Sequence, residues 1–235
     1  MPNTVTLFIP TLNEIEGMKA MMPRVKHEWC DQILVVDGNS TDGTLEYARE
    51  QGYEVVIQKK KGIRYAYIEG FPYVKGHYVI TFSPDGNSIP EIIPKLIEKI
   101  TEGYDMVIAS RYASGARSED DDMMTSMGNW LFTKTINFLH GAHYSDAMVI
   151  FRIYRTKLFT DLDLHKEESY APEKLFCTVA GIEPLLSVRC AKRRLRVSEI
   201  PANEPRRLGG KRKMRVVRWG GACMLEVLRE VYYWP

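Results

Sequence analysis

The stretch 83–88, with the sequence SPDGNS, places several oxygen-bearing side chains directly after the apolar run 78–82. Asp85 and Asn87, two residues apart, offer a carboxylate and an amide, which are oxygen ligands suited to Mg²⁺ or Mn²⁺. Such a cation commonly shares its coordination with the oxygens of a bound phosphate. An ordinary turn also uses Asp, Gly and Asn for their backbone preferences. Taken alone, the stretch is consistent with a metal and phosphate site or with a plain turn.

Three further polar segments follow apolar runs, namely 10–14 (PTLNE), 37–44 (DGNSTDGT) and 110–112 (SRY). The segments 37–44 and 83–88 both present carboxylates. Four cations are expected near them: Lys60, Lys61, Arg64 and Arg111. Opposite charges gathered in one place suit a diphosphate bound with a divalent cation better than they suit simple solvation.

These segments are positioned by a regular alternation of elements. Strands are predicted at 4–9, 32–36, 54–58, 78–82 and 105–109, and helices at 45–51, 63–74, 90–101 and 126–139. Alternation of this kind predicts an α/β fold, Rossmann-like, with a mainly parallel sheet and helices on both faces. In such a sheet the polar segments lie at the carboxyl ends of the strands, where ligands bind.

Composition limits the possible classes of protein. The 235 residues are 45% hydrophobic and 26% charged, which is typical of one globular domain. No apolar run approaches the length of a membrane span, and the amino terminus does not resemble a signal peptide, so a cytoplasmic protein is expected. The four cysteines show no CxxC spacing, which argues against a zinc ribbon or a disulfide framework.

Six stretches resemble the family 2 glycosyltransferases with the GT-A fold, most closely the dolichyl- or polyprenyl-phosphate sugar synthase branch. They occur in the expected order within residues 4–155. The matching stretches are FIPTLNE (8–14), ILVVDGNSTDGT (33–44), KGIRYAYIEG (61–70), SPDGNSIPE (83–91), MVIASRY (106–112) and FRIYR (151–155).

The resemblance implies an inverting transfer from a nucleotide-sugar donor (a GDP-, UDP- or dTDP-sugar) assisted by Mg²⁺ or Mn²⁺. It implies that Asp37 binds the base. The donor-binding residues implied in this chain are Pro10, Thr11, Asn13, Glu14, Asp37, Gly38, Lys61, Gly62, Arg64, Ser83 and Pro84.

One departure from the family concerns the metal loop. The family usually shows Asp-x-Asp, whereas this chain has Ser83 in place of the first acid, with Asp85 matching the second. Asn87 stands where the synthase branch offers Gln. A metal held by Asp85 and Asn87 is then expected to bind more weakly, or to depend more on the donor diphosphate, than one held by two acids. A catalytically impaired, donor-binding protein is the alternative.

Catalysis in this reading requires cations on the leaving diphosphate. Arg111 is the first candidate, followed by Arg117 and Arg152, because an Arg fork binds phosphate oxygens bidentately. A lipid phosphate acceptor is already an anion and needs no base, whereas a sugar hydroxyl needs one. Asp146 and Glu173 are the candidate bases. For Glu173, a surface charge at the start of a helix is the competing interpretation.

Two charged segments remain. The acidic run 119–122 is expected to be a solvated, mobile loop near the site. From Arg189 to Arg218 there are twelve Arg or Lys residues against two Glu. The synthase branch has a similar Gly-Gly stretch with Lys and Arg, thought to approach the acceptor phosphate. Lys211, Arg212 and Lys213 are the candidates for that role here.

The expected organisation is a glycosyltransferase domain at 1–205, followed by a basic loop and an amphipathic helix at 206–235. The expected acceptor is a polyprenyl phosphate or a glycan or lipid-linked acceptor, used at the inner face of an anionic membrane. A nucleic-acid binder acting through the basic tail is the alternative, although no reading motif supports it. A sugar-phosphate nucleotidylyltransferase is disfavoured because PTLNE replaces the Gly-rich loop after the first strand.

Overall fold

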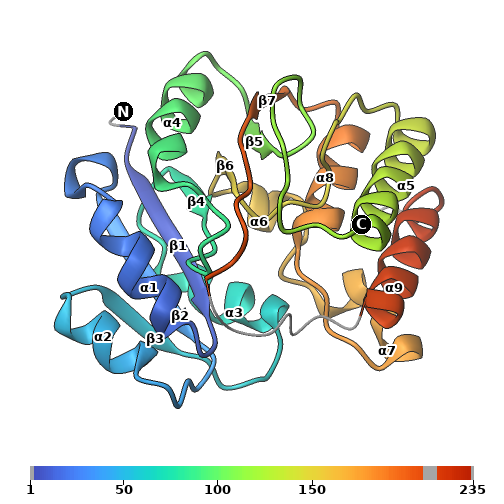
Figure 1. Cartoon of the computed structure of the whole chain (residues 1–235). Coiled ribbons are helices and arrows are strands. Elements are labelled where there is room, and N and C mark those ends of the chain that lie inside the picture. The colour runs from blue at the N-terminus through green and yellow to red at the C-terminus, as the bar shows by residue number, and fades with distance from the viewer. Residues whose placement is uncertain (1–2, 209–215, 234–235) are drawn as a thin grey trace.

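The computed structural model describes residues 3–208 and 216–233. In this part of the chain seven strands form one sheet in the order β3-β2-β1-β4-β6-β5-β7 (Figure 1). The strands are β1 (Val5–Thr11), β2 (Gln32–Asp37), β3 (Glu54–Ile57), β4 (Tyr78–Thr81), β5 (Met106–Ser110), β6 (Arg152–Arg155) and β7 (Val197–Pro201).

Most neighbouring strands run parallel, which confirms the predicted mainly parallel α/β sheet. β6 is the exception, because it pairs antiparallel with both β4 and β5. Because β4 and β5 are both antiparallel to β6, they point in the same direction. β5 therefore also points the same way as β1 and β2. The carboxyl ends of these four strands therefore lie at one edge of the sheet.

Helices cover both faces of the sheet. All seven residues of β1 and all five of β5 are buried. Because successive strand residues point to opposite faces, such runs require cover on each side. The α-helices are α1 (Ile15–Met21), α2 (Thr44–Glu50), α3 (Ile63–Gly70), α4 (Ile93–Thr101), α5 (Met123–His140), α6 (Leu158–Asp161), α7 (Glu173–Phe176), α8 (Glu183–Lys192) and α9 (Val216–Arg229).

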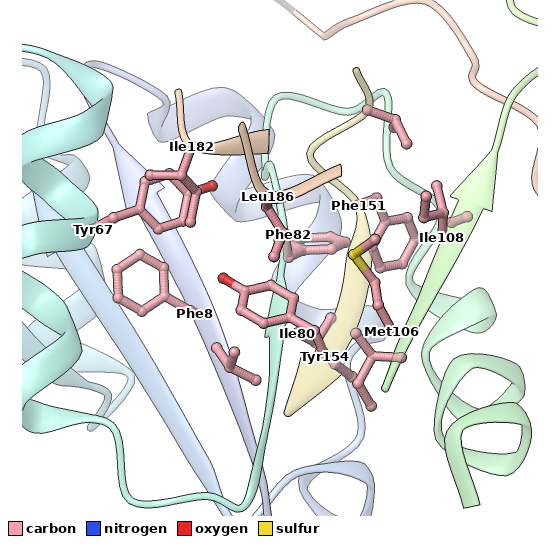
Figure 2. Packing of buried hydrophobic residues seen from close by; sticks show 14 of the residues in the cluster. Phe8, Tyr67, Ile80, Phe82, Met106, Ile108, Phe151, Tyr154, Ile182 and Leu186 are labelled. Carbon is pink, nitrogen blue, oxygen red and sulfur yellow. The ribbon is translucent and has the colours of Figure 1, made fainter. Parts of the chain in front are cut away.

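Aromatic rings dominate the core under α3. Phe8 stacks on Tyr67 with ring centroids 5.2 Å apart, and Phe71 stacks on Phe159 at 3.8 Å. Figure 2 shows Phe8 and Tyr67 side by side, with Tyr154 on β6. Rings in offset contact combine large apolar burial with a preferred geometry, so they fix α3 against β1 and β6.

Helix boundaries follow local chemistry. The predicted helix at 63–74 ends at Gly70, and a 3₁₀ turn at Phe71–Tyr73 follows because Pro72 cannot continue the hydrogen-bond ladder. α5 begins at Met123, earlier than predicted, because the Asp122 side chain accepts a hydrogen bond from the Thr125 amide as an N-cap.

The carboxyl-terminal part was not predicted to join the sheet. β7 pairs parallel with β5, and residues 202–208 then run back across the molecule towards the carboxyl end of β4 (Figure 1). The amphipathic helix predicted within 206–235 is found as α9. The basic residues Lys211, Arg212 and Lys213 lie outside the described ranges. No described helix is long and apolar enough to cross a bilayer.

Candidate functional site

Two loops at the ends of β1 and β2 are held together by a buried carboxylate. Asp37 is fully buried, and its carboxylate accepts hydrogen bonds from the Thr11 hydroxyl (3.1 Å), the Ser40 amide (2.8 Å) and the Ser40 hydroxyl (2.6 Å). The Gly38 amide donates to the Thr11 carbonyl at 2.8 Å. Asp37 and Gly38, both predicted donor-binding residues, therefore lie against Thr11, and Asp37 also fixes the loop that would surround a donor.

The same two loops are also joined through Asn13. Its amide donates to the Ser40 hydroxyl, and its side-chain oxygen accepts from the Thr41 amide, both at 2.8 Å. Asn13 has φ 52°, in the left-handed region that Asn tolerates better than most residues. The next amide, of Glu14, donates to the Thr44 hydroxyl at 2.9 Å. Pro10, which like Asn13 and Glu14 is a predicted donor-binding residue, pairs with Val36 inside the sheet.

The loop after β4 turns a buried carboxylate towards the segment that follows β7. Asp85 is 7% exposed, and its Oδ2 lies 3.5 Å from Nη1 of Arg207. The Leu208 amide donates to the Asp85 carbonyl at 2.7 Å. Burial raises the pKa of Asp85, and the Arg207 charge together with a hydrogen bond from Ser83 opposes that shift. The Asp85 carboxylate is therefore held out of water beside the Arg207 guanidinium.

Two glycines allow the close approaches around this loop. Gly86 has φ +95°, and a β-carbon there would lie 2.6 Å from a side-chain carbon of Leu208. Gly17, on α1, lies so close to the Pro84 carbonyl that any side chain would collide with it. Asn87 completes the turn, because its amide donates to Asp85 Oδ1 at 3.3 Å. The local structure therefore fixes the direction of the Asp85 side chain.

Arg207 joins Asp85 to the acidic run. Its Nη2 lies 2.8 Å from Oδ2 of Asp120, and its Nε lies 3.3 Å from both oxygens of the same carboxylate. This hydrogen bond is the main reason that the pKa of Arg207 is raised, with further contributions from Asp85 and Glu14. One guanidinium thus lies among acids from three separate loops.

Arg111 is held by three carboxylates. Its Nε and Nη2 bind Asp146 bidentately at 2.7 and 3.1 Å, and its Nη1 lies 3.4 Å from Asp121 and 3.3 Å from Glu204. Burial would lower the pKa of Arg111, but these carboxylates, with Asp146 first, raise it well above its ordinary value. Burial would raise the pKa of Asp146, but Arg111 keeps it below its ordinary value.

This arrangement corrects the interpretation of the acidic run. The middle of the run is not solvated, because the side chains of Asp120 and Asp121 are only 11% and 4% exposed, whereas Glu119 and Asp122 are exposed. Asp120 binds Arg207, Asp121 binds Arg111 and accepts a short hydrogen bond from the Tyr112 hydroxyl, and Asp122 caps α5. Three of the four acids therefore have side-chain contacts that order the loop, and the Glu119 amide donates to the Glu204 carbonyl at 2.8 Å.

Three predicted residues, Arg152, Arg64 and Glu173, contact residues other than Asp85. Arg152 is fully buried in the core, where it donates to the carbonyls of Val149 and Ala147 and to the Ser187 hydroxyl. The structure therefore does not bring Arg152 to the site as a phosphate ligand. Arg64 and Glu173 form a buried ion pair at 2.8 Å.

The Arg64–Glu173 pair lies beside a cavity of about 300 Å³. Burial raises the pKa of Glu173 to about 7, against the opposing effects of the Ala180 amide and Arg64. The cavity adjoins Gly62, because a β-carbon there would lie 2.7 Å from Val179 in its wall. The lining residues are Arg64, Tyr65, Glu167, Tyr170, Glu173, Lys174, Cys177, Thr178 and Val179.

Two further predicted residues, Lys61 and Arg117, are exposed to solvent. Lys61 is exposed beside Gly62, the residue that precedes α3. Arg117 is also exposed, and its amide donates to the Asn203 side chain at 3.0 Å. These positions leave both side chains open to solvent next to the ordered loops.

Sequence reasoning missed Arg207, Asp120 and Glu204 as partners of the predicted residues. The acidic run and the basic stretch were both visible, but Asp120 and Arg207 are separated by 87 positions. Only the parallel pairing of β7 with β5 carries residues 202–208 back to β4. A match of opposite charges between the two segments was the signal that could have suggested their contact.

The oxygen donors around Asp85 fit a hard divalent cation. Asp85 supplies a carboxylate that is buried and already faces a positive charge, and Asn87, two residues on, carries a side-chain oxygen that accepts a hydrogen bond from the Ser88 hydroxyl. Among the described residues no group of three or more His, Cys, Asp or Glu side chains is arranged to hold a metal by itself. The residues therefore fit a cation that takes the rest of its coordination from a bound phosphate or from water.

Comparison with known proteins agrees with this geometry. The family model described as "Glycosyl transferase family 2" matches residues 6–163. The chain is 30% identical over 230 residues to the glycosyltransferase AglJ of Haloferax volcanii, covering 97% of this chain and 72% of that protein. It is 28% identical over 243 residues to a dolichol-phosphate mannosyltransferase of Pyrococcus furiosus, covering 97% of this chain and 62% of that protein.

Solved structures give the same fold. Glucosyl-3-phosphoglycerate synthase from Mycobacterium tuberculosis, crystallised with Mn²⁺, uridine diphosphate and phosphoglyceric acid, superposes with a TM-score of 0.67. The match covers 99% of this chain and 80% of that one at 17% identity. The chain therefore has the GT-A fold, and it belongs to glycosyltransferase family 2.

Proposed function

We propose that this glycosyltransferase transfers a sugar, with inversion, from a nucleotide-sugar donor to a polyprenyl phosphate or to a glycan or lipid-linked acceptor. The donor would be a GDP-, UDP- or dTDP-sugar, and Mg²⁺ or Mn²⁺ would assist. Relatives named for dolichol phosphate and for polyprenol monophosphomannose support the lipid phosphate. The uridine diphosphate and Mn²⁺ of a structural neighbour support the donor and the metal.

One observation carries the proposal. The buried Asp85 carboxylate, at the carboxyl end of β4, faces a cation that also contacts Asp120. In parallel sheets this edge is where ligands bind. A carboxylate whose pKa is raised by burial gains most from a nearby positive charge. A divalent cation shared with a diphosphate would supply that positive charge.

Asp85 and Asn87 would hold the metal, which when bound would neutralise charge on the leaving diphosphate. The chain's own residues would orient the reactants. The Thr11–Asp37–Ser40 network would hold the two loops around the nucleoside. Arg111 and Arg207 would present fixed positive charge to phosphate oxygens, once a ligand competes with their present carboxylate partners.

The state of Asp146 favours an acceptor that needs no base. Asp146 is fully buried, bound bidentately to Arg111, and has a lowered pKa. A carboxylate in that state is a poor proton acceptor, so we assign it to positioning Arg111. A polyprenyl phosphate is already anionic and would attack without losing a proton. Glu173 remains the candidate base for a hydroxyl acceptor.

We further propose that residues 206–235 form a separate functional part that brings the domain at 1–205 to a membrane. In this proposal the protein is cytoplasmic and peripheral at the inner face. Lys211, Arg212 and Lys213 would bind the acceptor phosphate, with Arg117 at the rim. Basic residues near an anionic leaflet each contribute on the order of 1 kcal/mol.

The donor is tested by thermal unfolding with UDP-, GDP-, dTDP- and CDP-sugars, with and without Mn²⁺. A specific donor should raise the melting temperature in proportion to its occupancy. Transfer to a short-chain polyprenyl phosphate in detergent then tests the acceptor. Donor binding without transfer to any acceptor would indicate an impaired enzyme. Salt-sensitive binding of RNA or DNA without any nucleotide-sugar binding would contradict the proposal.

A further inference from the structure

Helix α5 has polar side chains on its buried side and large apolar side chains on its exposed side, the reverse of an ordinary surface helix. Its buried residues are Asn129, Thr133 and Ile136, two of which are polar. Its exposed side carries large apolar side chains, including Trp130 at 60% exposure and Phe138 at 88%. The exposed set, at helical spacing, is Met123, Met124, Met127, Trp130, Leu131 and Phe138. A contiguous exposed apolar surface of this kind marks an interaction site.

Helix α9 extends this surface. Figure 1 shows α5 and α9 side by side, at the end of the molecule opposite β3. The His140 ring at the end of α5 lies 3.1 Å from the Val227 carbonyl on α9. Leu225 and Leu228 are exposed on α9, and Tyr232 follows it at 92% exposure. We call the exposed apolar residues of α5 and α9 the apolar face.

Within α5 and α9 the exposed charged residues are cations, and the exposed Asp122 carboxylate at the start of α5 accepts hydrogen bonds from Thr125. Glu226 is the sole acidic residue in the sequences of the two helices, and it is buried. Lys134 and Arg218 are exposed on α5 and α9. In the sequence, α9 directly follows the basic run 211–215. Apolar side chains interleaved with cations complement an anionic lipid surface, where aromatic rings lie at the headgroup level.

The apolar face is continuous with the candidate active site. Asp122 caps α5, and the two preceding residues, Asp120 and Asp121, bind Arg207 and Arg111. A surface that rests on a membrane through α5 would therefore hold the site next to the headgroups. This is the geometry that a lipid phosphate requires, because its headgroup must reach the site while its chain stays in the bilayer.

We propose that the apolar face of α5 and α9 docks on an anionic lipid bilayer, with Trp130 and Phe138 inserted among the headgroups and Lys134 and Arg218 paired with lipid phosphates. The choice of a bilayer rests in part on the proposed lipid phosphate acceptor. The face itself is defined by exposure and charge alone.

Vesicle flotation of the full chain tests the proposal without donor or acceptor. The wild-type chain should float with vesicles of phosphatidylcholine mixed with phosphatidylglycerol, and less with phosphatidylcholine alone. Trp130→Ser combined with Phe138→Ser should lower partitioning by about tenfold or more, because both rings lose burial in the interface. Lys134→Glu should weaken binding to the anionic vesicles only.

Tyr73→Ser is the matched control. Tyr73 is an exposed aromatic residue at 55%, in the turn after α3 and remote in sequence from both helices. Its substitution should leave partitioning unchanged. Circular dichroism and the nucleotide-sugar thermal shift show whether each variant keeps its fold.

Equal flotation of the double variant and the wild type would overturn the proposal. A wild-type chain that ignores vesicles but sediments as a dimer, with the double variant monomeric, would assign the face to a second copy instead. Vesicle binding without any transfer to polyprenyl phosphate would refute the proposed acceptor while leaving the docking face intact. Transfer to a detergent-dispersed acceptor without vesicle binding would support the proposed acceptor and refute the docking face.

Discussion

Arg207 Nη1 lies 3.5 Å from Oδ2 of Asp85, the carboxylate predicted to hold a divalent cation. The same guanidinium binds Asp120 at 2.8 Å. A guanidinium of the chain itself therefore lies beside the predicted metal ligand. A metal at Asp85 and Arg207 would compete for the same negative charge, and this competition can be measured.

Removing the Arg207 charge should strengthen metal binding. Arg207→Gln is expected to lower the Kd for Mn²⁺ without nucleotide by a few-fold to about tenfold, because the tethered cation no longer neutralises Asp85. Titration followed by electron paramagnetic resonance of free Mn²⁺ measures this effect. Arg206→Gln, at the exposed neighbouring position, is the matched control. Unchanged or weaker Mn²⁺ binding in Arg207→Gln would show that the two cations do not compete.

Removing the Asp85 carboxylate should cost more in turnover than in folding. Asp85→Asn is expected to reduce metal-dependent transfer by about 10²-fold or more, since stabilisation of the leaving diphosphate is lost. Its melting temperature should stay close to that of the wild type, because the amide keeps the shape of a side chain whose charge is disfavoured by burial. Ser88→Ala, in the same loop, should retain activity. Equal rates for Asp85→Asn and wild type would remove Asp85 from the mechanism.

The Arg111 cluster should be a stability element as well as a part of the site. Arg111→Met leaves Asp146, Asp121 and Glu204 without their shared cation, and two of these carboxylates are almost fully buried. The expected loss in the free energy of unfolding is about 3–5 kcal/mol. Denaturant unfolding provides the measurement.

An exposed ion pair supplies the comparison for Arg111. Arg24 and Glu91 are paired at 2.7 Å with about half of each side chain exposed. Arg24→Met should cost less than about 1 kcal/mol, because water screens such pairs. Similar losses for both substitutions would mean that burial does not strengthen the Arg111 cluster.

The pH dependence of stability should contain a contribution from Glu173. Burial raises its pKa from 4.5 to about 7. Between these values the folded chain keeps a proton that the unfolded chain has released. The stabilisation is therefore complete below pH 4.5 and is lost as the pH rises to about 7.

Glu173→Gln cannot titrate, so its stability should fall less steeply between pH 4.5 and pH 7 than that of the wild type. Chemical unfolding at a series of pH values measures the slope. Other buried acids, such as Glu204 and Glu226, titrate in the wild type and in Glu173→Gln alike. Their contribution to the slope therefore cancels in the comparison. Glu168→Gln, at an exposed neighbouring position, should keep the wild-type slope. Parallel curves for wild type and Glu173→Gln would mean that Glu173 is ionised throughout this range.

The sequence predicted the strands β1 to β5, which follow the regular alternation of strands and helices along the chain. Apolar runs alternating with helices define β1 to β5, and the polar segments at 10–14, 37–44 and 83–88 fall at their carboxyl ends. β6 and β7 were not predicted, because neither continues the regular strand–helix alternation. Their pairing depends on contacts between distant parts of the chain, such as Met106 with Val197.

The partners of the site residues were harder to predict than the residues themselves. Asp85 and Arg111 are identified by residue type and position in the sequence. Whether each meets water, a metal or another side chain depends on which segments return to them. Arg152 shows the limit of residue type alone, because this Arg lies within a matching motif yet is buried and donates hydrogen bonds to backbone carbonyls.

Binding of Mn²⁺ in the presence of nucleoside diphosphates tests the central claim most directly. Electron paramagnetic resonance would follow free Mn²⁺ for wild type and Asp85→Asn across UDP, GDP, dTDP and CDP. For one of these nucleotides the wild type should bind one Mn²⁺ ion more tightly with nucleotide than without, and Asp85→Asn should lose that gain. Equal nucleotide-dependent Mn²⁺ binding by both chains, or none by the wild type with any nucleotide, would contradict a metal shared between Asp85 and the donor diphosphate.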